Sequence, residues 1–106
     1  MRSKKPAKAK QAALPRAADF SKGFQKDWER LGRSGRFDLK RLKEVMLLLI
    51  ANDVPLGPEW FDHALKGDWA DHRECHVGGD FLLIYTADDR QITFVRAGTH
   101  ADLFER

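Results

Sequence analysis

The sequence predicts an α+β domain in which a two-helix hairpin packs on a small, twisted antiparallel β-sheet. In the N-terminal half, apolar residues recur every three to four positions, as on one face of an α-helix. In the C-terminal half, the apolar spacing changes to two between turns rich in Gly and Asp, which is typical of strands. The 106 residues suffice for one domain with a single core.

The first predicted helix carries one apolar stripe, formed by Phe20, Phe24, Trp28 and Leu31. Asp19 or Ser21 can cap its start, and the glycines that follow the stripe can end it. A strand before this helix, near residues 14–18, is disfavoured because Pro15 and several alanines are poor strand formers.

The second helix is predicted from Asp38, its N-cap, to about Asn52. Its buried face consists of Leu39, Leu42, Val45, Met46, Leu49 and Ile50. Prolines then break the helix, and residues 59–70 form an irregular connection rich in aromatic residues. A strand follows from Arg73, in which Cys75 and Val77 lie on one face and Glu74 and His76 on the other.

Gly78, Gly79 and Asp80 predict a hairpin turn. The nearly continuous apolar run over 81–85 predicts a central strand, since both of its faces must be buried. After a second turn at 87–90, residues 91–97 form the last strand, and 100–104 suffice for one helical turn.

The positive charge is concentrated near the N-terminus. Residues 1–16 carry six basic and no acidic side chains, which predicts a disordered tail ahead of a domain over residues 17–106. The helical hairpin is also basic, whereas residues 51–106 are acidic. The formal net charge of +3 is therefore a property of the tail and the hairpin.

Several classes of protein are excluded by composition. The longest apolar run, over residues 45–51, is far shorter than the roughly 20 residues of a membrane span. No apolar core follows the basic N-terminus as in a secretory signal. The lone Cys75 excludes an internal disulfide framework and suits a reducing compartment. We therefore expect a cytoplasmic protein with no membrane contact.

The four histidines all lie in the C-terminal half, near carboxylates and strand arginines. This combination suits metal-free cleavage of RNA, which needs a base for the ribose 2′-hydroxyl, an acid for the leaving 5′-oxygen and cations for the phosphate. A zinc site at His72, Glu74 and His76 is an alternative, but Cys75 points to the opposite face and no metal-binding motif occurs. We expect no metal and no cofactor, and we expect Cys75 to be a buried apolar residue.

Four segments in fixed order carry a family resemblance: DHALKGDW at 62–69, RECHV at 73–77, DFLLIY at 80–85 and RAGTHADLF at 96–104. Together they closely resemble the YafQ-type toxins of the RelE/ParE superfamily, over roughly residues 18–104. The resemblance implies a compact fold with a helical hairpin on an antiparallel sheet. It also implies a ribosome-dependent endoribonuclease that cleaves translated mRNA. The expected partners are the ribosome with its mRNA and a cognate antitoxin, through which alone the toxin contacts operator DNA.

The family motifs fall on particular residues of this chain. The resemblance implies catalytic roles for His63, His76 and His100, with Asp80 orienting a histidine. Phe104, the terminal aromatic residue, would stack on a base of the mRNA. Glu74 stands where the family often has aspartate.

The two strand arginines complete the predicted site. We expect Arg96 to stabilise the charged transition state and Arg73, with Glu74, to contact the substrate. We further expect the basic side chains of the helical hairpin to attract ribosomal RNA, namely Lys22, Lys26, Arg30, Arg33, Lys40, Arg41 and Lys43.

Two other functions are compatible with the same superfamily. The protein could inhibit a target by binding alone, as ParE-like proteins act on DNA gyrase, although several proton-transfer groups are not needed for binding. It could also be an inactive toxin that acts mainly as a co-repressor with the antitoxin.

Overall fold

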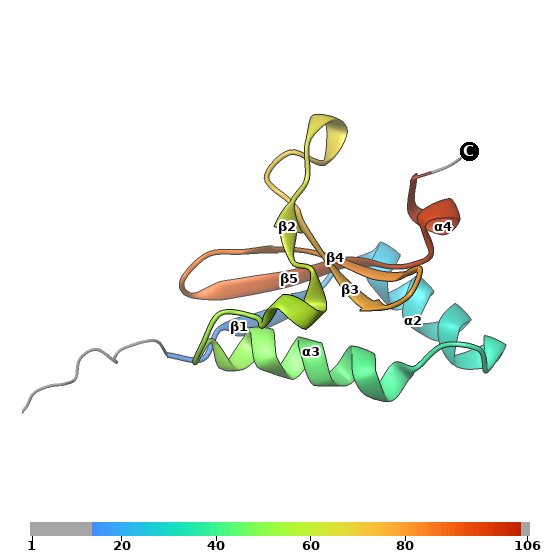
Figure 1. Cartoon of the computed structure of the whole chain (residues 1–106), viewed down its shortest axis with the longest axis horizontal. Helices are drawn as coiled ribbons and strands as arrows, with labels where there is room; N and C mark the ends of the chain where they lie inside the picture. Colours follow the sequence, from blue (N-terminus) through green and yellow to red (C-terminus); the bar gives the residue numbers. More distant parts are fainter. Residues whose placement is uncertain (1–13, 105–106) are drawn as a thin grey trace, which may run out of the picture.

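The computed structural model describes residues 14–104. The strands are β1 (Ala17–Phe20), β2 (His63–Ala64), β3 (Arg73–Gly78), β4 (Phe81–Ala87) and β5 (Gln91–Gly98). The helices are α2 (Lys22–Ser34), α3 (Leu39–Ala51), the two 3₁₀ turns η1 (Pro58–Trp60) and η2 (Gly67–Trp69), and the short α4 (His100–Phe104). All five strands form one sheet in the order β1-β5-β4-β3-β2 (Figure 1). The predicted α+β class, with a helical hairpin on a small sheet, is confirmed.

Local sequence signals account for the bounds of both long helices. The hydroxyl of Ser21 accepts a hydrogen bond from the Phe24 backbone N–H at 3.0 Å and starts α2. Gly35 ends α2 in the left-handed conformation, which glycine adopts without a steric cost. Asp38 caps α3 in the same way, by accepting from the Arg41 N–H at 3.0 Å. The predicted caps Ser21 and Asp38 are therefore confirmed.

The strand β1 was disfavoured by the sequence, yet it forms the edge of the sheet and pairs with β5 in parallel. All four of its residues are exposed, so it has no apolar alternation that could reveal it. Phe20 belongs to this strand rather than to the helix, and its ring stacks on Phe24 and Phe94 at centroid distances of 5.8 and 5.7 Å. The sheet is consequently mixed, with one parallel pair among antiparallel pairs.

Arg16 anchors the start of β1. Its guanidinium donates to the Leu49 carbonyl at 2.8 Å and to the Asp88 carbonyl at 2.7 Å. Arg16 was predicted to belong to the basic tail, but these bonds make it part of the folded domain. Residues 1–13 of that predicted tail lie outside the described residues.

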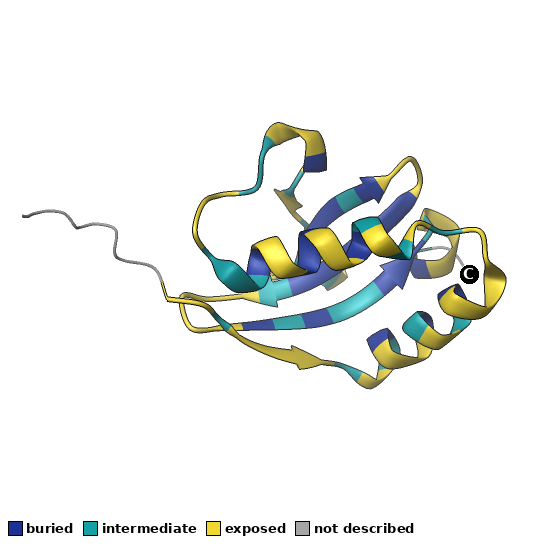
Figure 2. Cartoon of the chain, turned by 90° about the horizontal axis from the view of Figure 1, so that it is seen from below, coloured by how far each residue is buried: buried dark blue, intermediate teal, exposed yellow. Residues whose placement is uncertain are grey.

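The central strand β4 is buried on both faces, as predicted. Phe81, Leu83 and Tyr85 join the main core, which also contains the apolar faces of α2 and α3. Figure 2 shows this division on α3, whose buried residues face the strands while its exposed residues face outward. Leu82 and Ile84 point to the other side, where they pack with Leu103 of α4 in a second, smaller cluster. The sheet therefore has one face that the helices cover largely and one that is covered much less.

A buried carboxylate attaches α2 to β5. The side chain of Asp27 is only 5% exposed and accepts hydrogen bonds from Arg96 Nε at 2.6 Å, from Arg30 Nη2 at 2.9 Å and from the Ala97 backbone N–H at 2.9 Å. Ala97 lies beyond the stretch of β5 that pairs with β1, so Asp27 satisfies an edge N–H that no strand reaches.

The irregular connection after α3 contains more structure than the sequence indicated. Trp60 of η1 is buried beneath the guanidinium of Arg41, which lies 4.1 Å from the ring centroid and donates to the Val77 carbonyl at 2.6 Å. The chain then forms the two-residue strand β2, which was not predicted because so short a segment has no periodicity. No helix of the described residues is both long and apolar enough to cross a membrane.

We predict that Asp27→Ala lowers the free energy of unfolding by about 2 to 3 kcal/mol, because it leaves a buried N–H and two arginines without their shared acceptor. Urea denaturation measures this change. Glu29→Ala, on the exposed side of the same helix, should change stability by less than about 0.5 kcal/mol. Equal effects of the two substitutions would show that the buried network does not stabilise the fold.

Candidate active site

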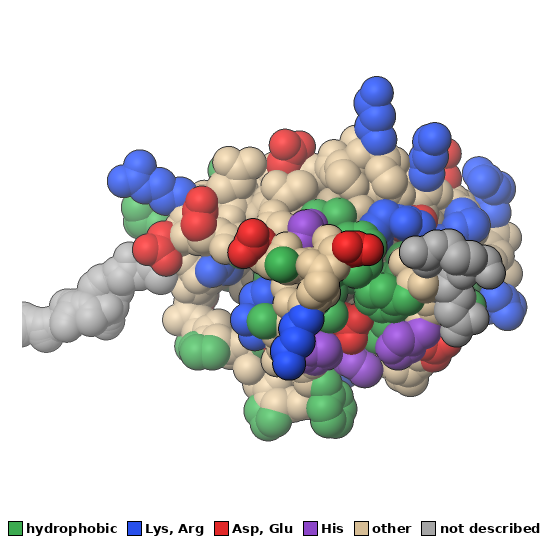
Figure 3. Space-filling view, turned by 90° about the horizontal axis from the view of Figure 1, so that it is seen from above, with side chains coloured by type: hydrophobic (Ala, Val, Ile, Leu, Met, Phe, Trp, Pro, Cys, Tyr) green, Lys and Arg blue, Asp and Glu red, His purple; other side chains and the backbone are tan. Residues whose placement is uncertain are grey.

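The candidate active site lies on the partly covered face of the sheet, away from α3. Cys75 and Val77 of β3 point into the helix-side core, and so the alternating residues Glu74 and His76 point to the opposite face. Histidine side chains gather on this face in the space-filling view, next to acidic and apolar side chains (Figure 3). Lys and Arg side chains are also visible on this face, both beside the histidines and towards the edges of the view (Figure 3).

Glu74 joins two histidines into one unit. Its side chain is 5% exposed, and its Oε2 lies 3.1 Å from His63 Nε2 and 3.4 Å from His76 Nε2. His63 reaches this position because β2 pairs with β3 in a register that sets His63 opposite Glu74. Glu74 was predicted from the sequence to contact the substrate, but its side chain is too buried for this. It instead contacts both imidazoles from the side of the sheet.

A second histidine–carboxylate unit is formed by His100 and Asp80. Oδ1 of Asp80 accepts the His100 backbone N–H at 3.1 Å and also contacts the ring Nδ1. Asp80 occupies the turn between β3 and β4, and His100 begins α4. The bond from the His100 ring, followed by the one from its backbone N–H, lowers the pKa of the Asp80 carboxyl below its ordinary value.

The helix α4 is held by a reciprocal cap. The Thr99 hydroxyl accepts from the Asp102 N–H, and the Asp102 carboxylate accepts from the Thr99 N–H, both at 3.1 Å. This second bond is the main cause of the lowered pKa of Asp102. Arg30 of α2 also contacts Asp102, at 3.2 Å. The cap and this ion pair fix α4, and therefore the position of the His100 ring, relative to the sheet.

The two units lie side by side. Ring centroids are 6.2 Å apart for His63 and His76, and 6.4 Å apart for His76 and His100. The row continues from His100 to Phe104 at 5.9 Å. The structure thus brings together five of the predicted site residues, namely His63, His76, Asp80, His100 and Phe104, with Glu74 beneath them.

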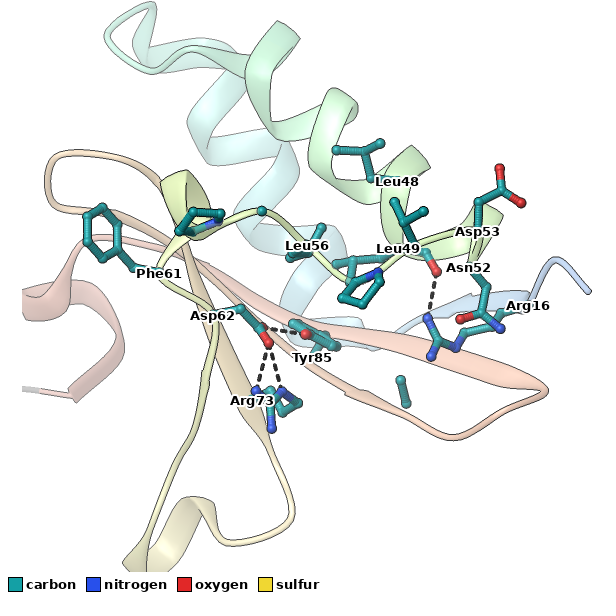
Figure 4. Close-up of a pocket in the computed structure, with 15 residues that line it drawn as sticks. Arg16, Leu48, Leu49, Asn52, Asp53, Leu56, Phe61, Asp62, Arg73 and Tyr85 are labelled. Atoms are coloured by element: carbon teal, nitrogen blue, oxygen red, sulfur yellow. Dashed lines mark hydrogen bonds and ion pairs between the residues drawn. The ribbon is translucent and has the colours of Figure 1, made fainter. Parts of the chain in front are cut away.

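Both predicted arginines lie elsewhere. Arg96 forms the ion pair with Asp27 of α2, and its pKa is raised chiefly by that hydrogen bond. Arg73 donates to Asp62 at 3.0 and 2.7 Å beside Tyr85, at the edge of a hollow of about 550 Å³ next to the end of α3 (Figure 4). Arg73 faces this hollow because it alternates with Glu74 along β3 and so points to the other face.

Cys75 is fully buried, as predicted. Burial raises the pKa of its thiol far above the ordinary value, so the thiolate needed for a nucleophile is not accessible at neutral pH. The described residues therefore offer histidines, and not the cysteine, as the reactive groups of this face.

The His63–Glu74–His76 unit also has the composition of a metal site. One ligand atom from each side chain lies within 4.8 Å of the others. Two imidazoles and a carboxylate fit three of the four positions around a zinc or copper ion. Sequence reasoning placed His72 in this set, but its Nδ1 lies 3.1 Å from the Ala70 carbonyl and its ring packs on Trp69. His63 takes its place through the unpredicted strand β2.

A helical hairpin on one face of a small sheet, with histidine–carboxylate pairs on the other face, is the combination that this chain presents, and its class is that of small bacterial toxins. The family model for the bacterial toxin of type II toxin–antitoxin systems, YafQ, matches residues 16–105. The chain belongs to this family.

Similar proteins of known name support the assignment. The mRNA interferase toxin YafQ of Escherichia coli K12 is 40% identical over 91 residues, which cover 86% of this chain and 98% of that protein. The crystal structure of the E. coli DinJ–YafQ toxin–antitoxin complex superposes with a TM-score of 0.76 at 40% identity, over 86% of this chain and 99% of that one. A metal-bound toxin from Helicobacter pylori superposes with a TM-score of 0.72 at 41% identity, over 83% and 98% of the two chains.

We predict that Asp80 titrates below the ordinary aspartate range, and that His100→Ala raises its pKa towards the ordinary value because the main hydrogen-bond donor is lost. Since the folded-state pKa is lowered, the contact with His100 persists at and above the ordinary pKa and is lost only as the pH falls through the lowered value. Carbon-detected NMR of the carboxyl group measures this titration. His72→Ala, whose ring contacts Trp69 and not Asp80, should leave the titration of Asp80 unchanged.

Proposed function

We propose that the protein is a ribosome-dependent endoribonuclease that cleaves translated mRNA, and that it is the toxin of a toxin–antitoxin pair. The observation that carries the proposal is the row of two histidine–carboxylate units, His76 with Glu74 and His100 with Asp80. The E. coli relative named mRNA interferase, which aligns over nearly its whole length, supports the same reaction.

The reaction is attack of a ribose 2′-oxygen on the adjacent phosphorus, with departure of the 5′-oxygen of the next nucleotide. Attacking and leaving oxygens lie on opposite sides of phosphorus, so a base and an acid are needed at two separate points. The side-by-side rings of His76 and His100 supply two such points. One imidazole accepts the 2′-hydroxyl proton while the other, protonated, donates a proton to the leaving oxygen.

The carboxylates have different parts in this scheme. Asp80 is exposed at the turn and binds the ring Nδ1 of His100, which leaves Nε2 directed away from the pair for proton transfer. Glu74 is a buried positioning residue that holds His76 and His63. His63 is 51% exposed and thus accessible to the scissile phosphate.

The negative charge that develops on the phosphate is stabilised by an imidazolium ring rather than by the strand arginines. Asp27 neutralises Arg96, and Asp62 neutralises Arg73. We therefore assign no direct catalytic step to either arginine, in contrast to the expectation from sequence. Arg96 acts through the α2–β5 contact, which with the Arg30–Asp102 pair positions α4 and His100.

We propose that the reaction uses metal-free histidines. A zinc or copper ion at His63, Glu74 and His76 would bind the imidazole of His76, which must exchange a proton in this scheme. Phe104, at the far side of His100, lies where it can stack on an unpaired base of the mRNA.

The partners follow from the reaction and from the relatives. The reaction takes place on the ribosome, which puts the protein in the cytoplasm. A cognate antitoxin would bind and neutralise it, since the similar E. coli toxin YafQ forms a toxin–antitoxin complex with DinJ. Contact with operator DNA would run through that antitoxin.

We predict that His100→Ala reduces the rate of mRNA cleavage at least 100-fold, because a general acid or base typically contributes a factor of this size. The far-UV circular dichroism spectrum and antitoxin binding should be retained. A ribosome programmed with a defined mRNA and mapping of 5′ ends measure the cuts. Asp89→Ala, in the exposed turn between β4 and β5, should cleave like the wild type. Growth inhibition without any mRNA cut by the wild type would instead favour a toxin that acts by binding its target.

The basic surface of the helices can be tested separately. Of the seven predicted basic residues, Arg30 and Arg41 bind Asp27 and the Val77 carbonyl, and Lys43 Nζ lies over the Trp28 ring, 5.7 Å from its centroid. We therefore restrict the predicted ribosome contact to the four that remain, all exposed: Lys22, Lys26, Arg33 and Lys40. Changing these four residues to glutamine should weaken ribosome binding more than tenfold and reduce its dependence on salt, because fewer counterions are released. Sedimentation with ribosomes at several salt concentrations measures both effects. Lys66→Gln with Arg90→Gln serves as the control, since both lie off the helices, and an unchanged salt dependence in the fourfold variant would contradict the assignment.

A further inference from the structure

A second hollow adjoins the row of histidines and is not used by the proposed chemistry. It has a volume of about 500 Å³ and is lined by Asp68, Trp69, His72, Leu103 and Phe104. Asp68 and Trp69 belong to η2, whereas Leu103 and Phe104 belong to α4. Two segments distant in sequence thus build one concave site. The loop that carries η2 and the helix α4 project from the same side of the sheet, opposite to α3 (Figure 1).

The rings that line this hollow continue the row of the candidate active site. Phe104 lies 5.9 Å from His100 on one side and 5.9 Å from Trp69 on the other. Trp69 in turn meets His72 edge-on at 5.1 Å. A substrate bound across His76 and His100 would therefore reach the hollow with its next segment.

The walls are held in place by backbone hydrogen bonds. The Leu65 N–H donates to the His72 carbonyl at 2.9 Å, and the His72 N–H donates to the Trp69 carbonyl at 3.0 Å. On the other side, Leu103 is buried against Leu82 and Ile84 and forms an apolar base for the hollow. The site is thus formed before any ligand arrives, which reduces the entropy lost on binding.

The chemistry of the lining favours a nucleobase over a phosphate. Aromatic and apolar side chains predominate, and among the described residues that line the hollow there is no Lys or Arg and the one carboxylate is that of Asp68. Aromatic faces stack with bases, whereas a carboxylate repels phosphate. A carboxylate also accepts hydrogen bonds from the exocyclic amino group of cytosine, adenine or guanine, whereas uracil has no amino group and offers only its ring N3–H.

We propose that this hollow is a base-binding subsite for a nucleotide next to the cleaved bond, and that Asp68 makes it prefer a base with an exocyclic amino group. The inference deepens the proposed function and rests on it for the identity of the RNA substrate. Trp69 is the central wall of the subsite, and Asp68 is its specificity-determining residue.

Binding can be tested without cleavage. NMR titration of the full chain with CMP, AMP, GMP and UMP should shift the indole N–H signal of Trp69 saturably, and UMP should bind at least threefold more weakly than CMP. Trp28, on α2, is the internal control and should not shift. Asp68→Asn should reduce the difference in affinity between UMP and CMP. Equal shifts of the Trp69 and Trp28 indole signals, or no shift of the Trp69 signal, would overturn the proposal.

Cleavage provides the second arm. With ribosomes and mRNAs that differ only in the bases around the cut, Trp69→Leu should lower cleavage at least tenfold and flatten the base preference at one position. Trp69→Phe, which keeps an aromatic face, should restore most of both. If the wild type cleaves and Trp69→Leu keeps the same base preference and rate, the subsite is wrong while the nuclease stands. If the nucleotides bind at Trp69 but the wild type cuts no mRNA, the nuclease is wrong, and with it the place of this site next to a cleaved bond; only nucleotide binding at Trp69 then remains.

Discussion

The burial of β4 on both faces is the constraint on which the rest of the structure depends. Its five residues from Phe81 to Tyr85 are all buried, so apolar cover is needed above and below the sheet. The helical hairpin covers one face of β4 and most of that side of the sheet. The other face is covered only by α4 and the partly buried side chains around Trp69, and the histidines occupy the gap between these small covers.

This arrangement explains why the two carboxylates of the site behave differently. Glu74 lies on β3 beside the centre of the sheet, where its neighbours exclude water, and it meets both His63 and His76. Asp80 lies in an exposed turn and binds one histidine through both its ring and its backbone N–H. A buried carboxylate fixes geometry, whereas an exposed one remains close to solvent and to an incoming substrate.

The arginines of the described region are used mainly to assemble the domain. Arg16 joins β1 to α3, Arg41 covers Trp60, and Arg96 shares Asp27 with Arg30. Each has a carbonyl, an aromatic ring or a carboxylate as its partner. For Arg96, as for Arg73 with Asp62, this partner engages the charge that the sequence-based prediction assigned to the substrate. In the mechanism we propose, proton transfer and charge stabilisation at the candidate site therefore both fall to the histidines.

The sequence by itself determined the elements with strong local signals. The periodicity of the two helices, the caps at Ser21 and Asp38 and the doubly apolar run of β4 are short-range properties, and all appear in the structure. The motifs also predicted most of the residues that meet at the site. Only the tertiary structure decided that β1 pairs in parallel, that β2 sets His63 opposite Glu74, and that Asp27 and Asp62 engage the two arginines. These features depend on backbone pairing and on ion pairs between distant segments, such as Ala17 and Gln91, which are 74 positions apart in the chain. Such contacts produce no periodic pattern in the sequence of either segment, so the sequence alone does not reveal them.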